Sequence, residues 1–314
     1  MPRVTTEEVA DHFHSYAGLP VQPPSRWHRW QLWCLRQAVH GLLPLRQLWP
    51  RYDLPLRPRQ GRLSFELVSH CWQYSHLLEY QLGSLAAHPP RDCQVTLTVY
   101  YSREDTRTHS LLELASRTSV PNVRWNWRAV PKEHLFRRSV GRNHAALNTE
   151  ADWIWFTDCD LMWGEKCLDT LATNLQDCGS VLVYPRQENL TTLLNEDELV
   201  QSQAPALRVP CGALEFTTTA VTKAKGPLQI MHGDAARAIG YCRDVAACQR
   251  AEPVFQKCVE DTVFRWLLGT HGTPVTVPNV SRIRHLAKGR YSGSTTRNQV
   301  RTWVRKVQER LRGN

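Results

Sequence analysis

Two aspartates separated by a single residue carry the strongest chemical signal in this sequence. Asp158 and Asp160 follow the apolar run from Trp153 to Phe156, and the chain continues apolar from 161 to 163. Such a run predicts a buried strand, and open α/β sheets bind ligands beyond the carboxyl ends of their strands. On extended backbone both carboxylates leave the same face and repel each other unless a cation lies between them. The pair therefore predicts a site for Mg2+ or Mn2+, shared with substrate phosphates.

The same motif has an ordinary alternative, because Asp is common in solvated turns and at helix N-caps. The apolar residues on both sides favour the ligand site, since a turn seldom interrupts a buried segment. By strand alternation, Cys159 between the two acids is expected to point into the core.

The segments around these acids alternate between strand patterns and helix patterns. Strands are predicted at 95–101, 123–127, 153–156, 179–184, 213–222 and 274–277. Helices are predicted at 65–88, 110–117, 133–149, 165–177, 235–240 and 262–268. This alternation predicts an α/β fold whose mostly parallel central sheet is flanked by helices. The polar, weakly periodic residues 186–208 are expected to form a loop-rich insertion over the site.

The chain length of 314 residues and the apolar fraction of 42% allow one large α/β domain with extensions, or two ordinary domains. We expect a Trp/Arg-rich helical extension at residues 1–62, the α/β domain at 63–296, and a basic C-terminal helix at 297–314.

A net charge of +10 raises the hypothesis of nucleic-acid binding. The arginines are spread along the chain, however, and no zinc-finger, homeodomain or RNA-recognition signature is present, so no nucleic acid is expected as a partner. An enzyme that handles nucleotide diphosphates, or one that works beside an anionic membrane, fits the charge equally well.

Tryptophans alternate with basic residues between positions 26 and 49. One interpretation is an interfacial helix that makes peripheral contact with anionic lipid through aromatic anchors and a basic rim. The alternative is a helix that packs its tryptophans on the protein's own surface. We favour the second, because surface helices of that kind are far commoner.

Ten cysteines are scattered without a Cys-x-x-Cys pair, which favours free thiols in a reducing compartment. Residues 1–14 lack the basic start and apolar core of a signal peptide, and no apolar segment is long enough to span a bilayer. The expected location is cytoplasmic, with peripheral membrane contact left open.

Further residues complete a recognisable order. Arg142-Asn143 lie on a predicted helix, His232-Gly233 form a glycine-containing loop, Glu260-Asp261 begin a helix, and His285 follows late in the chain. Together with the Asp-Cys-Asp motif, this order resembles the GT-A glycosyltransferases, particularly the inverting type of family 2. The resemblance covers about residues 92–290. It implies a Rossmann-like GT-A fold and transfer of a sugar from a nucleotide-sugar donor, UDP-linked by default, to a hydroxyl of a saccharide or glycolipid.

The resemblance also implies roles for individual residues. Asp160 and His285 would bind Mn2+ or Mg2+, and Asp158 would contact the ribose or share the ion. Asp261, in the acid pair with Glu260, would be the catalytic base. Positions that would contact the nucleotide are Arg142 and Asn143, together with Tyr101, Ser102 and Glu104 in the loop 101–105 that should line the base pocket.

The chemistry of glycosyl transfer agrees with these roles. Cleavage of a sugar–diphosphate bond leaves negative charge on the diphosphate, which Lys288 and Arg290 on a closing loop would help to bind. A single displacement needs a carboxylate on the opposite face of the sugar, and Asp261 at a helix N-terminus is expected to stay ionised.

Each of these residues also has an ordinary alternative role: a helix cap for Glu260-Asp261, a surface hydrogen bond for His285, solvation for Lys288 and Arg290, and a pair with Glu150 for Arg142. The family's processive members carry Gln-x-x-Arg-Trp after the base, a spacing that residues 299–303 miss, which favours a soluble enzyme that adds one sugar. Competing hypotheses are a retaining glycosyltransferase, a sugar nucleotidyltransferase, and a basic nucleic-acid or membrane-binding module whose acids are structural.

Overall fold

The structure is a computed structural model that describes residues 12–15, 25–48, 52, 54–195, 199, 204–210, 214–251, 253 and 259–286. Within these residues no helix combines the length and the apolar character needed to cross a bilayer. Eight cysteines lie in the described part, and all of them are free thiols. The predicted C-terminal helix at 297–314, together with Trp49, Lys288 and Arg290, lies outside the described residues.

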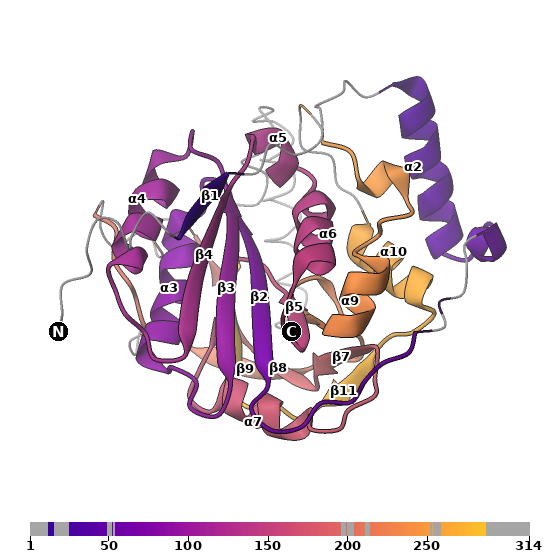
Figure 1. Ribbon diagram of the computed structural model, residues 1–314. Coiled ribbons are helices and arrows are strands. Elements are labelled where there is room, and N and C mark those ends of the chain that lie inside the picture. Colours follow the sequence, from indigo (N-terminus) through magenta and orange to yellow (C-terminus); the bar gives the residue numbers. More distant parts are fainter. Residues whose placement is uncertain are drawn as a thin grey trace, which may run out of the picture.

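A mostly parallel sheet forms the centre of the molecule, with helices on both of its faces (Figure 1). In the described part it has eight strands, in the order β1 (Phe13–Ser15), β4 (Val123–Ala129), β3 (Gln94–Tyr101), β2 (Ser64–Cys71), β5 (Trp153–Phe156), β10 (Gln229–His232), β7 (Leu182–Pro185) and β11 (Thr273–Val275). Strand β10 is antiparallel to both neighbours, and the other pairings in this sheet are parallel. The predicted fold class is confirmed.

Successive residues of a strand point to opposite faces, and the helices divide between those faces accordingly. Tyr101 stacks on His109 of α4 (Thr106–Ser116). Its neighbour Tyr100 bonds to His144 of α6 (Arg138–Asn148) on the other face. The other helices in the described part of the domain are α3 (Ser75–Ala87), α5 (Lys132–Leu135), α7 (Cys167–Asn174), α9 (Gly233–Ile239) and α10 (Glu260–Leu268). The predicted helix at 133–149 is thus two helices, α5 and α6.

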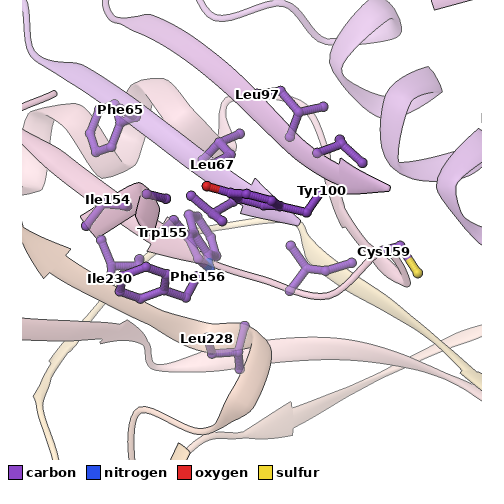
Figure 2. Packing of buried hydrophobic residues seen from close by; sticks show 14 of the residues in the cluster. Phe65, Leu67, Leu97, Tyr100, Ile154, Trp155, Phe156, Cys159, Leu228 and Ile230 are labelled. Atoms are coloured by element: carbon purple, nitrogen blue, oxygen red, sulfur yellow. The ribbon is translucent and has the colours of Figure 1, made fainter. Parts of the chain in front are cut away.

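Strand β5 is buried along its whole length, as its unbroken apolar sequence predicts. Trp155 and Phe156 lie beside side chains from β2 and β10 in the core (Figure 2). Phe156 also meets the rings of Tyr241 and Phe264 edge-on. This packing fixes the position of the end of β5, and therefore the position of the two aspartates that follow it.

One prediction is wrong in a way that matters for the site: residues 65–88 are not one helix but strand β2 followed by helix α3. Strand β2 pairs with β3 on one edge and β5 on the other, so seven of its eight residues are buried. The strand also buries Glu66, Ser69 and His70 among its apolar residues, so it lacks the unbroken apolar run that identifies β5. Its apolar residues therefore matched helical spacing by coincidence.

A smaller sheet packs beside the aspartates. Its order is β6 (Leu161–Trp163), β12 (Val280–His285), β8 (Gln187–Leu194) and β9 (Phe216–Ala220). The prediction of a loop-rich segment at 186–208 is therefore wrong for β8. Buried Glu188 accepts hydrogen bonds from Arg282 of β12, so this strand buries a charge and gives no apolar pattern.

The N-terminal residues attach to the domain at two places. Strand β1 pairs with β4 at one edge of the central sheet. Helix α2 (Arg26–Val39) begins at the N-cap Ser25, whose hydroxyl accepts a hydrogen bond from the His28 amide, and it packs against α10. Its buried residues include Leu32 and Leu35, whereas its tryptophans are exposed. The expectation that the tryptophans pack on the protein's own surface is wrong.

Candidate functional site

The two aspartates lie at the carboxyl edge of the central sheet. The amide of Thr157 donates to the carbonyl of Val68, which extends the pairing of β5 with β2 by one residue. Asp158 then leaves the sheet, and Asp160 immediately precedes β6. Gln81 of α3 fixes this turn, because its Nε2 donates to the carbonyl oxygens of Asp158 at 2.8 Å and Leu161 at 2.9 Å.

Asp158 is held by two arginines from one face of helix α6. Arg138 forms an ion pair with Oδ1 of Asp158, and Nη2 of Arg142 donates to the same oxygen at 3.2 Å. Residues four apart on a helix lie on one face, so both guanidinium groups reach the same carboxylate. Asp158 therefore faces two cations of the protein itself.

The Arg142 side chain is only 1% exposed, and both of its Nη atoms donate hydrogen bonds within the protein. It also donates to the Thr157 carbonyl at 3.2 Å and to the Tyr241 hydroxyl at 3.0 Å. Burial disfavours its charge, but Tyr241 and Asp158 outweigh that cost and raise the pKa of Arg142 above its ordinary value. Arg142 thus holds the Asp158 carboxylate in position from the buried side. The alternative role, an ion pair with Glu150, is not needed to explain why Arg142 is buried.

Asn143, the neighbour of Arg142, points toward α9. Its Oδ1 accepts a hydrogen bond from the Tyr241 amide at 2.9 Å. Gly240 lies against it with a φ of +65°, and a Cβ at that glycine would lie 2.2 Å from Oδ1. Asn143 therefore fixes the turn after α9 rather than presenting its amide at the site.

The two acids at the start of α10 face different neighbours. Glu260, 8% exposed, accepts a hydrogen bond from the Ser139 hydroxyl at 3.0 Å and lies 3.7 Å from Nε of Arg138. Asp261, 35% exposed, lies 3.8 Å from Nη1 of Arg265. Glu260 therefore belongs to the cluster around Asp158, whereas Asp261 is the acid that solvent reaches.

Asp261 lies at the same edge of the sheet as Asp158. Its Oδ2 accepts a hydrogen bond from the Gly226 amide at 3.4 Å, at the start of the 3-10 turn η2 (Gly226–Leu228). That turn leads into Gln229, which pairs with Phe156 at the carboxyl end of β5. The helix start thus places both acids near the aspartates.

Strand β12 brings His285 to Asp160, although 125 positions separate them in the sequence. Nε2 of His285 lies 3.9 Å from Oδ2 of Asp160, and both side chains are buried. The Ile283 amide donates to the Asp160 carbonyl at 2.9 Å, which ties β12 to the turn. Among the described residues no group of three or more His, Cys, Asp and Glu side chains forms a metal-binding cluster. One carboxylate and one imidazole fit a Mn2+ or Mg2+ ion whose other ligands come from phosphate and water.

The loop that borders this pair follows β2, not β3, because β2 is the neighbour of β5. Tyr74 in this loop packs its ring edge-on against His285, with 5.3 Å between centroids. Asp105 braces the same loop, since its Oδ2 accepts a hydrogen bond from the Gln73 amide at 2.5 Å. Residues 72–74 were missed because the sequence pattern placed them inside a helix.

The loop predicted to line a base pocket lies one strand further from β5. Tyr101 is buried against α4, and Ser102 is buried beside it. Glu104 is exposed and forms an ion pair with Lys132 at 2.7 Å. Tyr101 is the last residue of β3 and the other two follow it, so the structure does not bring the three residues beside the aspartates.

Two further predictions have clear outcomes. His232-Gly233 lie at the opposite edge of the sheet, because β10 runs antiparallel and pairs His232 with Trp153 at the start of β5. Strand β10 ends at His232 and α9 begins at Gly233, so the prediction of a loop is wrong, and the two residues are not part of the site. Cys159 is buried as predicted, and a hydrogen bond with Cys71 and burial together raise its pKa well above the ordinary value.

Arg138 and Gln81 are further members of this site that sequence reasoning missed. For Arg138 a signal exists, because it lies four residues before Arg142 on the same helix. Gln81 offers no such signal, since its role depends on how α3 packs on the turn between β5 and β6.

No protein-family model and no curated protein matches this sequence. Among solved structures, a mannosyltransferase from Pyrobaculum calidifontis in complex with GDP-Man and Mn2+ aligns with 90% of this chain and 76% of its own, at 16% identity and a TM-score of 0.42. TarS 1-349 from S. aureus aligns with 76% of this chain, at 14% identity and a TM-score of 0.37, and this chain covers 63% of its length. At these TM-scores neither likeness bears on the activity of this chain.

Proposed function

We propose that this protein is a metal-dependent, inverting glycosyltransferase that uses a nucleotide-sugar donor, with UDP as the first nucleotide to test. The observation that supports it most is the meeting of Asp160 and His285 at the carboxyl edge of the sheet, beside Asp158 and two acids of α10. A saccharide or a glycolipid is the acceptor class that we propose.

Asp160 and His285 would hold Mn2+ or Mg2+, and Asp158, fixed by Arg138 and Arg142, would orient the ribose or share the ion. When bound, the divalent ion supplies a positive charge that stabilises the leaving diphosphate. Arg138 is 38% exposed, so solvent reaches its guanidinium, and we propose that a phosphate oxygen of the donor binds there beside Asp158.

Asp261 is the catalytic base in this proposal, because its carboxylate is accessible to solvent and lies in the first turn of α10, at the same edge of the sheet as Asp158. The acceptor oxygen attacks the anomeric carbon, the bond from that carbon to the diphosphate oxygen breaks, and Asp261 takes the hydroxyl proton. The electron pair leaves with the nucleoside diphosphate, and the anomeric configuration inverts. Glu260 acts as a positioning residue for Arg138.

Thermal shift with UDP, GDP, ADP and CDP, each with and without Mn2+, tests the site before any substrate is known. We expect one nucleoside diphosphate to raise the melting temperature only when Mn2+ is present. His285→Ala and Asp160→Asn should each remove that shift, whereas the matched control His109→Ala, on α4, should keep it. A metal-independent shift, or full retention of the shift in both site variants, contradicts the proposal.

Product analysis then tests the reaction. NMR of the glycoside should show an anomeric configuration opposite to that of the donor, together with release of a nucleoside diphosphate. Retention of configuration, or release of pyrophosphate, would instead identify one of the competing enzyme classes.

A further inference from the structure

The exposed apolar side chains of this protein gather in one short segment. In the described part of the chain, the large hydrophobic residues exposed to solvent are Trp27, Trp30, Trp33, Leu42, Leu48 and Val209. All but Val209 lie within residues 27–48. Scattered exposed apolar residues are ordinary, but a concentration of this kind marks an interaction surface.

The tryptophans lie on the outward side of α2. They are three and six residues apart, 63%, 53% and 55% exposed, and the rings of Trp27 and Trp30 stack with 4.7 Å between centroids. The inward side of the helix buries Leu32 and Leu35 in the core of the protein. Figure 1 shows α2 at the outer side of the molecule, beside α10. We name this outward side, with the exposed Leu42 and Leu48, the α2 face.

The charge of the segment has one sign only. Residues 25–48 contain four arginines and no acidic residue. Arg26 and Arg29 are exposed on α2 among the tryptophans. A second copy of the chain that presented the same face would bring like charges together, whereas an anionic surface would neutralise them.

The α2 face is joined firmly to the domain. Arg46 donates hydrogen bonds to the carbonyl oxygens of Trp266 at 2.9 Å and Leu267 at 2.7 Å, at the C-terminus of α10, and its guanidinium lies over the Trp266 ring. A basic side chain is favourable at that helix end. The exposed tryptophans are thus presented on a fixed helix.

We propose that the α2 face is a docking surface for an anionic lipid bilayer. The tryptophan rings enter the interface between headgroups and acyl chains, and the arginines bind the headgroup phosphates. This inference is independent of the proposed activity, because binding to lipid needs neither a donor nor a metal ion.

Co-sedimentation with vesicles tests it directly, using phosphatidylcholine with and without phosphatidylglycerol. The wild-type chain should sediment with the anionic vesicles and stay in solution with the neutral ones. Trp30→Ala/Trp33→Ala should weaken binding about tenfold or more. Arg26→Glu/Arg29→Glu should weaken it about thirtyfold or more, because each arginine near an anionic surface contributes a factor of about five.

The matched control is Arg107→Glu/Arg117→Glu, which makes the same change of net charge at exposed arginines of α4 and its C-cap. It should keep binding within about twofold of the wild type. Equal loss in the control would show that overall charge attracts the lipid, which overturns the proposal. All substituted side chains are exposed, so unchanged circular dichroism and melting temperature are expected in each variant.

Two other results would also overturn the inference. One is equal binding to neutral and anionic vesicles. The other is a wild-type chain that does not bind lipid but forms a concentration-dependent dimer in analytical ultracentrifugation, where Trp30→Ala/Trp33→Ala is monomeric. That result would make a second copy of the chain the occupant of the α2 face.

Discussion

Burial should decide how much each arginine that holds Asp158 contributes to stability. Arg142 and Arg138 bind the same carboxylate oxygen, but their side chains are 1% and 38% exposed. Removal of one partner from a buried ion pair costs about 3–5 kcal/mol, whereas a solvent-exposed pair contributes about 0–1 kcal/mol. We therefore expect Arg142→Met to lower the free energy of unfolding by about 3–5 kcal/mol, and Arg138→Met by less than about 1 kcal/mol.

Urea unfolding at pH 7, followed by circular dichroism, measures both variants against the wild type. The same substitution is made four residues apart on one helix, so helix propensity cancels between the two proteins. In an Asp158→Asn background the cost of Arg142→Met should fall by about 0.5–3 kcal/mol, because the charge that it compensates is gone. Equal costs for the two arginines, or a cost below about 1 kcal/mol for Arg142→Met, would refute the assignment of Arg142 as the buried support of the site.

Three further predictions follow from other residues. Asp261→Asn should lower kcat by about 10²–10⁴, and Glu260→Gln by much less; the reverse order in single-turnover assays would make Glu260 the base. Gln81→Met should lower the free energy of unfolding in urea by about 1–3 kcal/mol. It should also weaken Mn2+-dependent nucleotide binding, because it releases the turn that carries Asp158, and unchanged binding would show that Gln81 does not support the site. Burial opposes ionisation of Glu188, but Arg282 and Lys225 outweigh it and lower its pKa below the ordinary value of 4.5. The stability that Glu188 contributes with Arg282 and Lys225 should therefore be present above pH 4.5 and be lost as the pH falls through the lowered pKa. In Glu188→Gln the free energy of unfolding should depend less on pH over this range, and a dependence identical to that of the wild type would contradict the reasoning.

The position of the aspartates could be predicted because the signal is local. A four-residue strand buried on both faces is apolar throughout, and the acids that interrupt it mark its end. The partner His285 was placed by resemblance alone, since its approach to Asp160 depends on the pairing of β12 with β6.

The neighbourhood of the site was harder to predict, for physical reasons that can be named. Strand β2 looked helical because its buried polar residues interrupt the apolar run, and this error hid the loop after β2 that borders the site. Strand β10 was not predicted, and its reversed direction leaves no trace in local sequence, so the position of His232-Gly233 at the opposite edge could not be predicted. For α2, the spacing showed an amphipathic helix but not which side faces the protein. His28, Leu32 and Leu35 compete with the tryptophans for that role, and the aliphatic side packs inward.

The central claim is that Asp160 and His285 together hold a divalent ion at the edge of the sheet. Anomalous diffraction from a crystal soaked with Mn2+ and a nucleoside diphosphate measures this most directly. We predict one strong peak within bonding distance of the Asp160 carboxylate and the His285 imidazole, next to the diphosphate oxygens. A nucleotide bound at this edge without a peak there, or a peak held by other residues, would contradict the account.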